Sequence, residues 1–285
     1  MQLFAPAKIN LRFQILRRRE DGFHEIETLM APISLRDEIT VEPNDDGVGI
    51  AFSCDDPGLP AGEDNLVLRA ARSFYAETNA QPSVRIELRK KIPHGAGLGG
   101  GSSDAASTLL GLNELHGRPL TRARLTNLAA GIGSDVPFFI CESAALCRGR
   151  GEIVEPVAAL PKLPLLLLKP EFGVPTPWAY QRWHESRELP GIDYAEQTAG
   201  ELVLRNDLER PVFEKYVFLF RMKQWLREQP EVAAALLSGS GSTLFAVLGE
   251  VAAADALATR AREELDPALW TCAAVVDASL WEARE

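Results

Sequence analysis

A glycine-rich stretch near the middle of the chain constrains the fold more than any other segment. Five glycines fall within the seven residues from Gly95 to Gly101. Glycine loses more conformational entropy on folding than any other residue, so such a cluster is tolerated where the backbone needs positive φ angles or approaches a bulky group closely. A simple turn needs fewer glycines. The cluster therefore favours a loop that is shaped around a ligand.

The segments on either side of this loop predict which ligand it holds. Residues 84–89 alternate apolar and charged side chains, which is typical of a half-buried strand. After the loop, apolar residues recur at helical spacing over 105–112, with Ser102 or Ser103 as the expected N-cap. A strand, a glycine loop and a helix in this order direct free N–H groups and the positive end of a helix dipole at one point. The pattern predicts a phosphate site.

Two common phosphate motifs do not account for the loop. Residues 95–100 match the pattern G-x-G-x-x-G of dinucleotide-binding folds, but the nearest candidate for the required acidic residue, Glu114, lies in the predicted helix. A Walker A loop needs lysine and then serine or threonine after its last glycine, and no such sequence occurs in the chain. The loop is therefore expected to belong to another class of nucleotide-binding protein.

Composition further limits the class of protein and the partners that it can bind. A chain of 285 residues with 46% hydrophobic content is expected to form about two domains with an ample core. The formal net charge of −10 argues against general binding of nucleic acid or of an anionic membrane, although a local basic cleft can still take an anionic substrate. The four cysteines lack C-x-x-C spacing and are expected to be reduced thiols. Without a signal-like or membrane-spanning segment, we expect a cytoplasmic protein; no pattern specifies an oligomeric state.

The first predicted strand contains two polar residues that are candidates for a functional site. Apolar and polar residues alternate strictly from Ile9 to Ile15, so the strand has one polar face, and Lys8 and Asn10 lie at its start. On this pattern alone, the simplest interpretation of Lys8 is a solvated charge at the end of a strand.

Three other positions allow both a structural and a functional interpretation. His24 follows Phe23 directly after the hairpin turn predicted at residues 21–22, and a histidine beside an aromatic ring is more often packed or exposed than catalytic. Asn65 is as well suited to cap a helix as to bind a ligand. Asp135 lies between two glycines and a proline, beside an apolar run, so it is held more tightly than a surface aspartate; the alternative is a helix cap.

The sequence pattern changes after the first half of the chain, where prolines and a continuous apolar run appear. Several prolines precede the continuous apolar run 165–168, which predicts a strand buried on both faces. We place a domain boundary here, between residues 1–155 and residues 156–285. The second part predicts alternating helices and strands, with a helix over 212–227 and a second glycine loop at 238–242.

Three blocks in the same order resemble the signature motifs of the GHMP kinase superfamily, which comprises small-molecule kinases without a Walker A loop. These blocks are residues 6–11, 93–103 and 238–242, and the similarity spans almost the whole chain. Further segments resemble the branch that phosphorylates a cytidine diphosphate-linked methylerythritol in non-mevalonate isoprenoid biosynthesis. These segments are residues 21–24, 64–66, 133–139, 175–177 and 206–209.

The resemblance implies a fold and a set of roles. The fold is the α+β two-domain GHMP kinase fold, with an N-terminal domain like the second domain of ribosomal protein S5, a ferredoxin-like C-terminal domain, and the site between them. Asp135 is implied as the general base and Lys8 as its cationic partner. The resemblance implies ATP as the cofactor, with the adenine near Asn65. Without a Walker lysine, phosphoryl transfer also calls for Mg²⁺, and a hydroxyl of Ser102 or Ser103 is expected to reach either the metal or a phosphate.

The same resemblance implies two binding regions. The ATP-binding residues are Pro93, Gly95, Gly97, Leu98, Gly99, Gly100, Gly101, Ser102, Ser103 and Asn65. The residues implied for the small-molecule acceptor are Asn10, Phe23, His24, Asp135, Thr176 and Tyr180. Phe23 replaces a tyrosine that is common in the family, and it keeps the ring face that stacks on a cytosine.

Three alternatives stay open at this point. Another GHMP kinase would act on a sugar, homoserine or a mevalonate derivative. A regulatory nucleotide-binding protein would keep the fold without catalysis, although the presence of both Lys8 and Asp135 argues against it. A nicotinamide-dependent oxidoreductase would follow from a literal interpretation of G-x-G-x-x-G.

Overall fold

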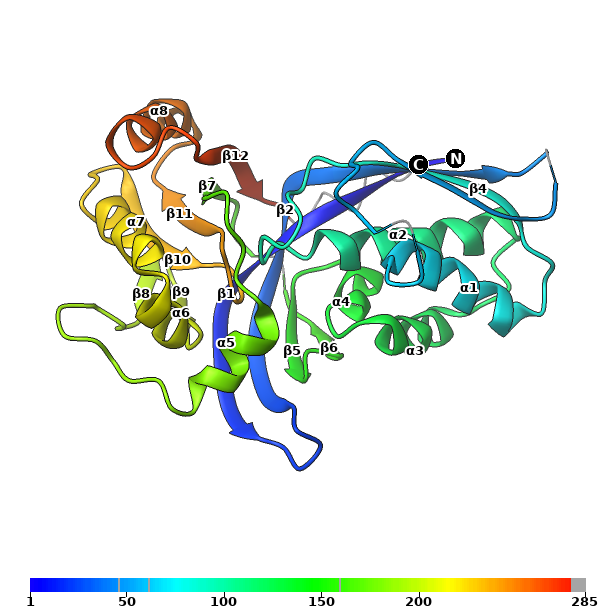
Figure 1. Ribbon diagram of the computed structural model, residues 1–285, viewed down its shortest axis with the longest axis horizontal. Coiled ribbons are helices and arrows are strands. Elements are labelled where there is room, and N and C mark those ends of the chain that lie inside the picture. Colours follow the sequence, from blue (N-terminus) through cyan, green and yellow to red (C-terminus); the bar gives the residue numbers. More distant parts are fainter. Residues whose placement is uncertain (46, 61, 159, 278–285) are drawn as a thin grey trace.

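The structure is a computed structural model that describes residues 1–45, 47–60, 62–158 and 160–277. Two long antiparallel strands, β1 (Gln2–Arg18) and β2 (His24–Pro43), run through the middle of the molecule (Figure 1). They pair with strands in both of its halves. The tight turn predicted at residues 21–22 joins them, and Gly22 has a φ of 85° there. Every other element is arranged around this pair.

The N-terminal half forms a sheet with helices beside it (Figure 1). Its other strands are β3 (Gly49–Cys54), β4 (Ser83–Arg89), β5 (Ala145–Gly149) and β6 (Ile153–Pro156). Its helices are α1 (Leu66–Thr78), α2 (Gly100–Leu115), α3 (Arg122–Ile132) and α4 (Val136–Cys141). Strand β4 and helix α2 flank the first glycine loop, so the predicted order of strand, loop and helix is confirmed.

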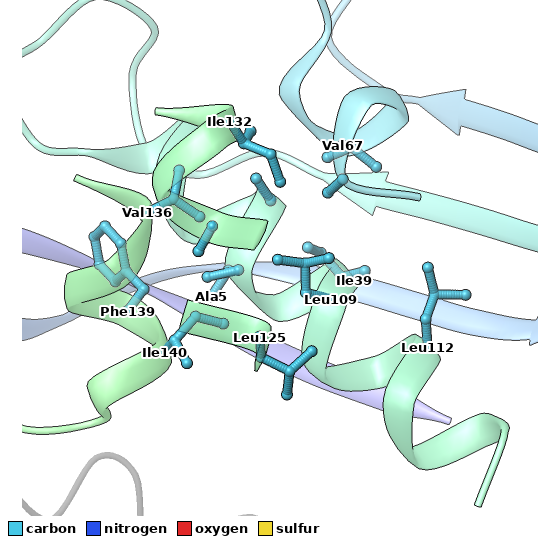
Figure 2. Packing of buried hydrophobic residues seen from close by; sticks show 14 of the residues in the cluster. Ala5, Ile39, Val67, Leu109, Leu112, Leu125, Ile132, Val136, Phe139 and Ile140 are labelled. Carbon is cyan, nitrogen blue, oxygen red and sulfur yellow. The ribbon is translucent and has the colours of Figure 1, made fainter. Parts of the chain in front are cut away.

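Helix α2 lies at the centre of this half because its small and apolar residues let the neighbouring elements approach. At Gly111, a Cβ atom would lie only 2.7 Å from Leu3 Cδ1. Figure 2 shows the core that α2 shares with the strands and the other helices. The labelled core residues are Ala5, Ile39, Val67, Leu109, Leu112, Leu125, Ile132, Val136, Phe139 and Ile140. This packing fixes the position of α2, and with it the place of the glycine loop from which the helix begins.

The C-terminal half contains a second sheet region in the order β10-β11-β7-β12, which continues through β2 and β1 to β9 and β8. Its strands are β7 (Leu163–Lys169), β8 (Gln197–Ala199), β9 (Leu202–Asn206), β10 (Val232–Leu237), β11 (Leu244–Leu248) and β12 (Trp270–Val276). Its α-helices are α5 (Thr176–Trp183), α6 (Glu209–Lys215), α7 (Val217–Arg227) and α8 (Ala254–Glu264), with a short 3₁₀ turn at Val251–Ala253. The apolar run 165–168 lies in β7 between β11 and β12, as its composition predicts.

Two predictions about this half have different outcomes. The single helix predicted over 212–227 is wrong, because Tyr216 adopts a non-helical conformation, with φ of −103° and ψ of 68°, that separates α6 from α7. The boundary between residues 1–155 and 156–285 falls at the last residue of β6, just before the link to β7, and stays a prediction, since β1 and β2 pair with strands of both halves. Within the described residues, no helix is long and apolar enough to cross a membrane.

Candidate active site

A cavity of about 750 Å³ lies where the two halves meet. Its walls come from β1, the turn after β1, the first glycine loop, the start of α4, helix α5 and the second glycine loop. It gathers most of the predicted site residues, namely Lys8, Asn10, Phe23, His24, Pro93, Gly95, Gly97, Leu98, Gly99, Gly100, Gly101, Ser102, Asp135, Thr176 and Tyr180. Asn65 and Ser103 are the predicted residues that do not line it.

Lys8 is held rigidly inside this cavity. Its side chain is 4% exposed, and its ammonium donates hydrogen bonds to Asn10 Oδ1 at 2.7 Å and to the Gly97 carbonyl at 3.0 Å. The Asn10 amide in turn donates to Thr28 Oγ1 at 2.8 Å. The interpretation of Lys8 as a solvated charge is therefore wrong: the polar face of β1 is covered by loops that are distant in sequence.

Asp135 points into the same space. It occupies the N-cap position of α4, but its side chain makes no capping hydrogen bond, so the alternative of a simple helix cap is not realised. Its Oδ2 lies 3.7 Å from Lys8 Nζ, and its side chain is 35% exposed. The carboxylate thus keeps lone pairs that can accept a proton from a hydroxyl in the cavity.

The first glycine loop leads into α2 earlier than predicted. The helix begins at Gly100, and Gly99 caps it with a φ of 72° and without a side chain, so neither Ser102 nor Ser103 is the N-cap. The first N–H groups of a helix have no partner within it. Here they belong to Gly100, Gly101 and Ser102, which line the cavity, so these N–H groups are available to an anion at the positive end of the helix dipole.

The two glycine loops contact each other directly. A Cβ atom on Gly97 would lie 2.1 Å from the Ser238 carbonyl oxygen, and the Ser238 hydroxyl donates to the Gly97 carbonyl at 3.0 Å. The Asn206 amide donates to the Leu237 and Gly239 carbonyls at 2.7 Å each and so holds the second loop in place. Gly97 is therefore required for the contact between the loops.

Aromatic rings form the other end of the cavity. The His24 and Tyr180 rings lie 5.4 Å apart at an angle of 31°, and Phe23 is 52% exposed beside them. Burial lowers the pKa of His24, and the charges of Arg18 and His184 lower it further. The neutral imidazole offers one donor and one acceptor. Burial also raises the pKa of the Tyr180 hydroxyl, which therefore stays neutral. With uncharged rings on its walls, this end suits a flat, uncharged polar ring.

Asn65 uses its side chain to cap α1. Its Oδ1 accepts from Val67 N at 2.9 Å and from Leu68 N at 3.4 Å, while its amide donates to the Pro60 carbonyl at 2.8 Å. The adjacent Leu66 lines the cavity. A position for the adenine close to Asn65 therefore stays a prediction, with the apolar side chain of Leu66 as the available contact.

Sequence reasoning missed two cations in the cavity wall, Lys90 and Arg150. Lys90 directly follows the strand predicted over 84–89 and lies three residues before Pro93, and this position between strand and loop was the available signal. Its ammonium donates hydrogen bonds to the buried carboxyl groups of Asp37 and Asp104, the latter at 2.7 Å to Oδ2. Arg150 lies in the short hairpin between β5 and β6, where no periodic pattern indicates a function.

Ser240 of the second glycine loop is a further cavity residue that the sequence analysis does not single out, although it identifies the loop itself. Its hydroxyl lies 2.8 Å from Thr176 Oγ1.

Comparison with known proteins agrees with this geometry. The model of the family described as GHMP kinases N terminal domain matches residues 65–143. With this fold and this site, the chain is a GHMP kinase, a phosphotransferase that acts on an alcohol. A protein of Methylacidiphilum infernorum named 4-diphosphocytidyl-2-C-methyl-D-erythritol kinase is 43% identical over 248 residues, which are 87% of this chain and 86% of that protein. The chain belongs to the 4-diphosphocytidyl-2-C-methyl-D-erythritol kinase family.

Sequence identity to solved structures distinguishes members of this family from other proteins that share only the fold. A crystal structure of 4-(cytidine 5'-diphospho)-2C-methyl-D-erythritol kinase has a TM-score of 0.79 and 36% identity, covering 97% of this chain and 99% of that one. A homoserine kinase from Cytophaga hutchinsonii has a TM-score of 0.67 and 19% identity, covering 96% of this chain and 93% of that one. The second likeness shows the fold alone. Membership of a kinase family implies ATP as the phosphoryl donor.

Proposed function

We propose that this enzyme transfers the γ-phosphoryl group of ATP to the 2-hydroxyl of 4-(cytidine 5'-diphospho)-2-C-methyl-D-erythritol, a step of non-mevalonate isoprenoid biosynthesis. One observation carries the proposal: the Lys8–Asp135 pair lies between an anion site and an aromatic end within one cavity. The substrate of the family's named relatives has a reacting alcohol and a cytosine ring, which match these two requirements.

Phosphoryl transfer needs charge neutralisation, in-line placement and an acceptor for the hydroxyl proton. In this proposal, Asp135 accepts the proton from the acceptor's hydroxyl, because its carboxylate points into the cavity without a capping role. Lys8 stabilises the negative charge of the carboxylate and of the developing alkoxide. The N–H groups at the start of α2 hold the phosphates of ATP, and Leu66 supports the adenine near Asn65.

The residues present also fit Mg²⁺. Mg²⁺ is usually held by substrate phosphates, waters and one or two protein oxygens, so a cluster of three acidic or histidine ligands is not needed, and the described residues contain none. Ser103 Oγ is buried without a hydrogen-bond partner, and Ser102 lines the cavity beside it. We propose that one of these hydroxyls contributes to the metal site. When bound, Mg²⁺ would offset the charge that builds up on the transferred phosphoryl group.

At the other end of the cavity, Phe23, His24 and Tyr180 would enclose the cytosine ring, with Asn10 and Thr176 close to the rest of the acceptor. Neutral His24 would exchange hydrogen bonds with the base. The cysteines are free thiols, which supports the expected cytoplasmic location.

A coupled assay of ADP release tests the proposal. The purified enzyme is given ATP, Mg²⁺ and one acceptor at a time: 4-diphosphocytidyl-2-C-methyl-D-erythritol, homoserine, mevalonate or galactose. Turnover confined to the cytidylated acceptor is expected. Turnover with a different acceptor alone would keep the superfamily and overturn the proposed substrate.

A further inference from the structure

We infer that Arg150 binds the diphosphate group of the acceptor and thereby selects a nucleoside diphosphate conjugate over an uncharged nucleoside. This inference rests on the proposed function. Arg150 lies in the hairpin between β5 and β6, and it lines the cavity with a side chain that is 33% exposed. The hairpin is held in shape by Glu152, whose Oε2 accepts a hydrogen bond of 2.5 Å from the Arg150 backbone N–H. The side chain therefore extends from a fixed backbone.

The hairpin contacts both ends of the proposed acceptor site. The Arg150 guanidinium carbon lies 4.9 Å from the centre of the Phe23 ring, at the aromatic end. At the next residue, a Cβ on Gly151 would lie 3.6 Å from Asp135 Oδ1, at the catalytic end. An acceptor that stacks its base near Phe23 and presents its hydroxyl to Asp135 must span this interval. In the proposed substrate, the diphosphate is the group that connects those two parts.

Of the lysines and arginines in the described cavity wall, Arg150 is the one whose charged group is best placed to bind the diphosphate. Among the described lysines and arginines that line the cavity, Lys8 is held by Asn10, Gly97 and Asp135, and Lys90 donates hydrogen bonds to two buried aspartates. Arg150 instead has an ionic contact with Glu152 at 3.6 Å, which is too long for a good hydrogen bond. A guanidinium presents a planar set of donors that matches phosphate oxygens and also lies against an aromatic face.

Inhibition by two fragments of the acceptor tests this inference. Cytidine diphosphate carries the proposed diphosphate, and cytidine lacks it. Each is measured as a competitor of 4-diphosphocytidyl-2-C-methyl-D-erythritol at saturating ATP, in the wild type and in Arg150→Gln, Arg150→Lys and Arg148→Gln. Arg148 belongs to the same hairpin but pairs with Glu27 and Glu155 and does not line the cavity, so Arg148→Gln is the matched control.

We expect Arg150→Gln to weaken binding of cytidine diphosphate by about 10- to 100-fold and to leave cytidine binding and the KM for ATP unchanged. Arg150→Lys should recover part of the loss, and Arg148→Gln should match the wild type. An equal loss for both inhibitors would show that Arg150 acts through the Phe23 ring, and no loss would place the diphosphate elsewhere; either result overturns the inference. Absence of turnover by the wild type would contradict the proposed function instead, before any variant is compared.

Discussion

The Lys8 ammonium lies 3.7 Å from the Asp135 carboxylate and is prevented from moving closer by its hydrogen bonds to Asn10 and Gly97. The pair is therefore close enough for strong electrostatic attraction and too far apart for a hydrogen bond. This separation leaves the carboxylate available to the hydroxyl of a substrate. It also ties the proposed catalytic pair to the first glycine loop, because the Gly97 carbonyl accepts a hydrogen bond from Lys8.

Replacing Lys8 with methionine should remove the charge and keep the length of the side chain. We expect kcat to fall by about 10²–10³-fold, because a fixed cation at the reacting atoms is lost. Asn10 Oδ1 also loses its buried donor, so the free energy of unfolding should fall by about 1–3 kcal/mol. Steady-state kinetics and urea unfolding measure the two effects. A folded Lys8→Met protein with normal kcat would remove Lys8 from the mechanism.

Two glycine substitutions in the first loop should differ in their effect on stability. Gly97→Ala places a Cβ 2.1 Å from the Ser238 carbonyl, whereas Gly95→Ala has nothing within 4 Å; both residues have positive φ angles, of 77° and 63°. Gly95→Ala should cost only the backbone strain, about 1–2 kcal/mol. Gly97→Ala should lose more stability because the two glycine loops must separate. Equal unfolding free energies for the two variants would contradict the close approach of the loops.

Substitution of His24 should weaken binding of the cytidylated acceptor and leave binding of ATP unchanged. Its ring lies 5.4 Å from the Tyr180 ring, away from the glycine loop, so we expect His24→Ala to raise the KM for the cytidylated acceptor by about tenfold or more and to change the KM for ATP little. Initial rates with each substrate varied in turn provide the measurement. A similar rise in both KM values would place His24 outside the acceptor pocket.

Stability should depend on pH through Asp104. Burial raises the pKa of Asp104 to about 8, the charge of Asp37 adds to the rise, and Lys90 opposes it. An aspartate with a raised pKa binds a proton in the folded state that the unfolded state has already lost above about pH 4. Its contribution to stability is therefore complete below that pH and is lost as the pH rises towards 8, by up to about 1.4 kcal/mol per pH unit.

Urea unfolding of the wild type and of Asp104→Asn at several pH values isolates this contribution, since the variant cannot titrate. We expect the advantage of the wild type to shrink steadily from pH 4 to pH 8. Asp193→Asn is the control, because the Ala195 N–H and Arg227 lower the pKa of Asp193, so its contribution to stability is lost only as the pH falls below about 4 and stays constant from pH 4 to pH 8. A difference between wild type and Asp104→Asn that does not change with pH would show that Asp104 is ionised throughout.

The glycine loop between β4 and α2 could be predicted from sequence, because a cluster of glycines indicates a backbone that needs positive φ angles or a close approach. The start of α2 was nevertheless placed too late, since Gly99 caps the helix through a positive φ angle that rules based on serine caps do not detect. The break between α6 and α7 was missed for a similar reason, because no glycine or proline marks Tyr216.

The burial of Lys8 could not be predicted from local pattern. Alternation in β1 placed Lys8 on the polar face, but the groups that cover it come from Gly97 and Asp135, far along the chain. Arg150 was missed because its significance depends on its distance to Phe23, which only the fold determines. Local periodicity identifies elements and loops, whereas contacts between distant segments decide which charges are buried.

Single-turnover phosphorylation of 4-diphosphocytidyl-2-C-methyl-D-erythritol by the wild type and by Asp135→Asn tests the central claim most directly. The substitution keeps the shape of the side chain and removes its ability to accept a proton. With ATP binding shown to be intact, we expect the rate of phosphoryl transfer to fall by about 10²–10⁴-fold. A folded Asp135→Asn enzyme that phosphorylates this acceptor at the wild-type rate would contradict the assignment of Asp135 as the base.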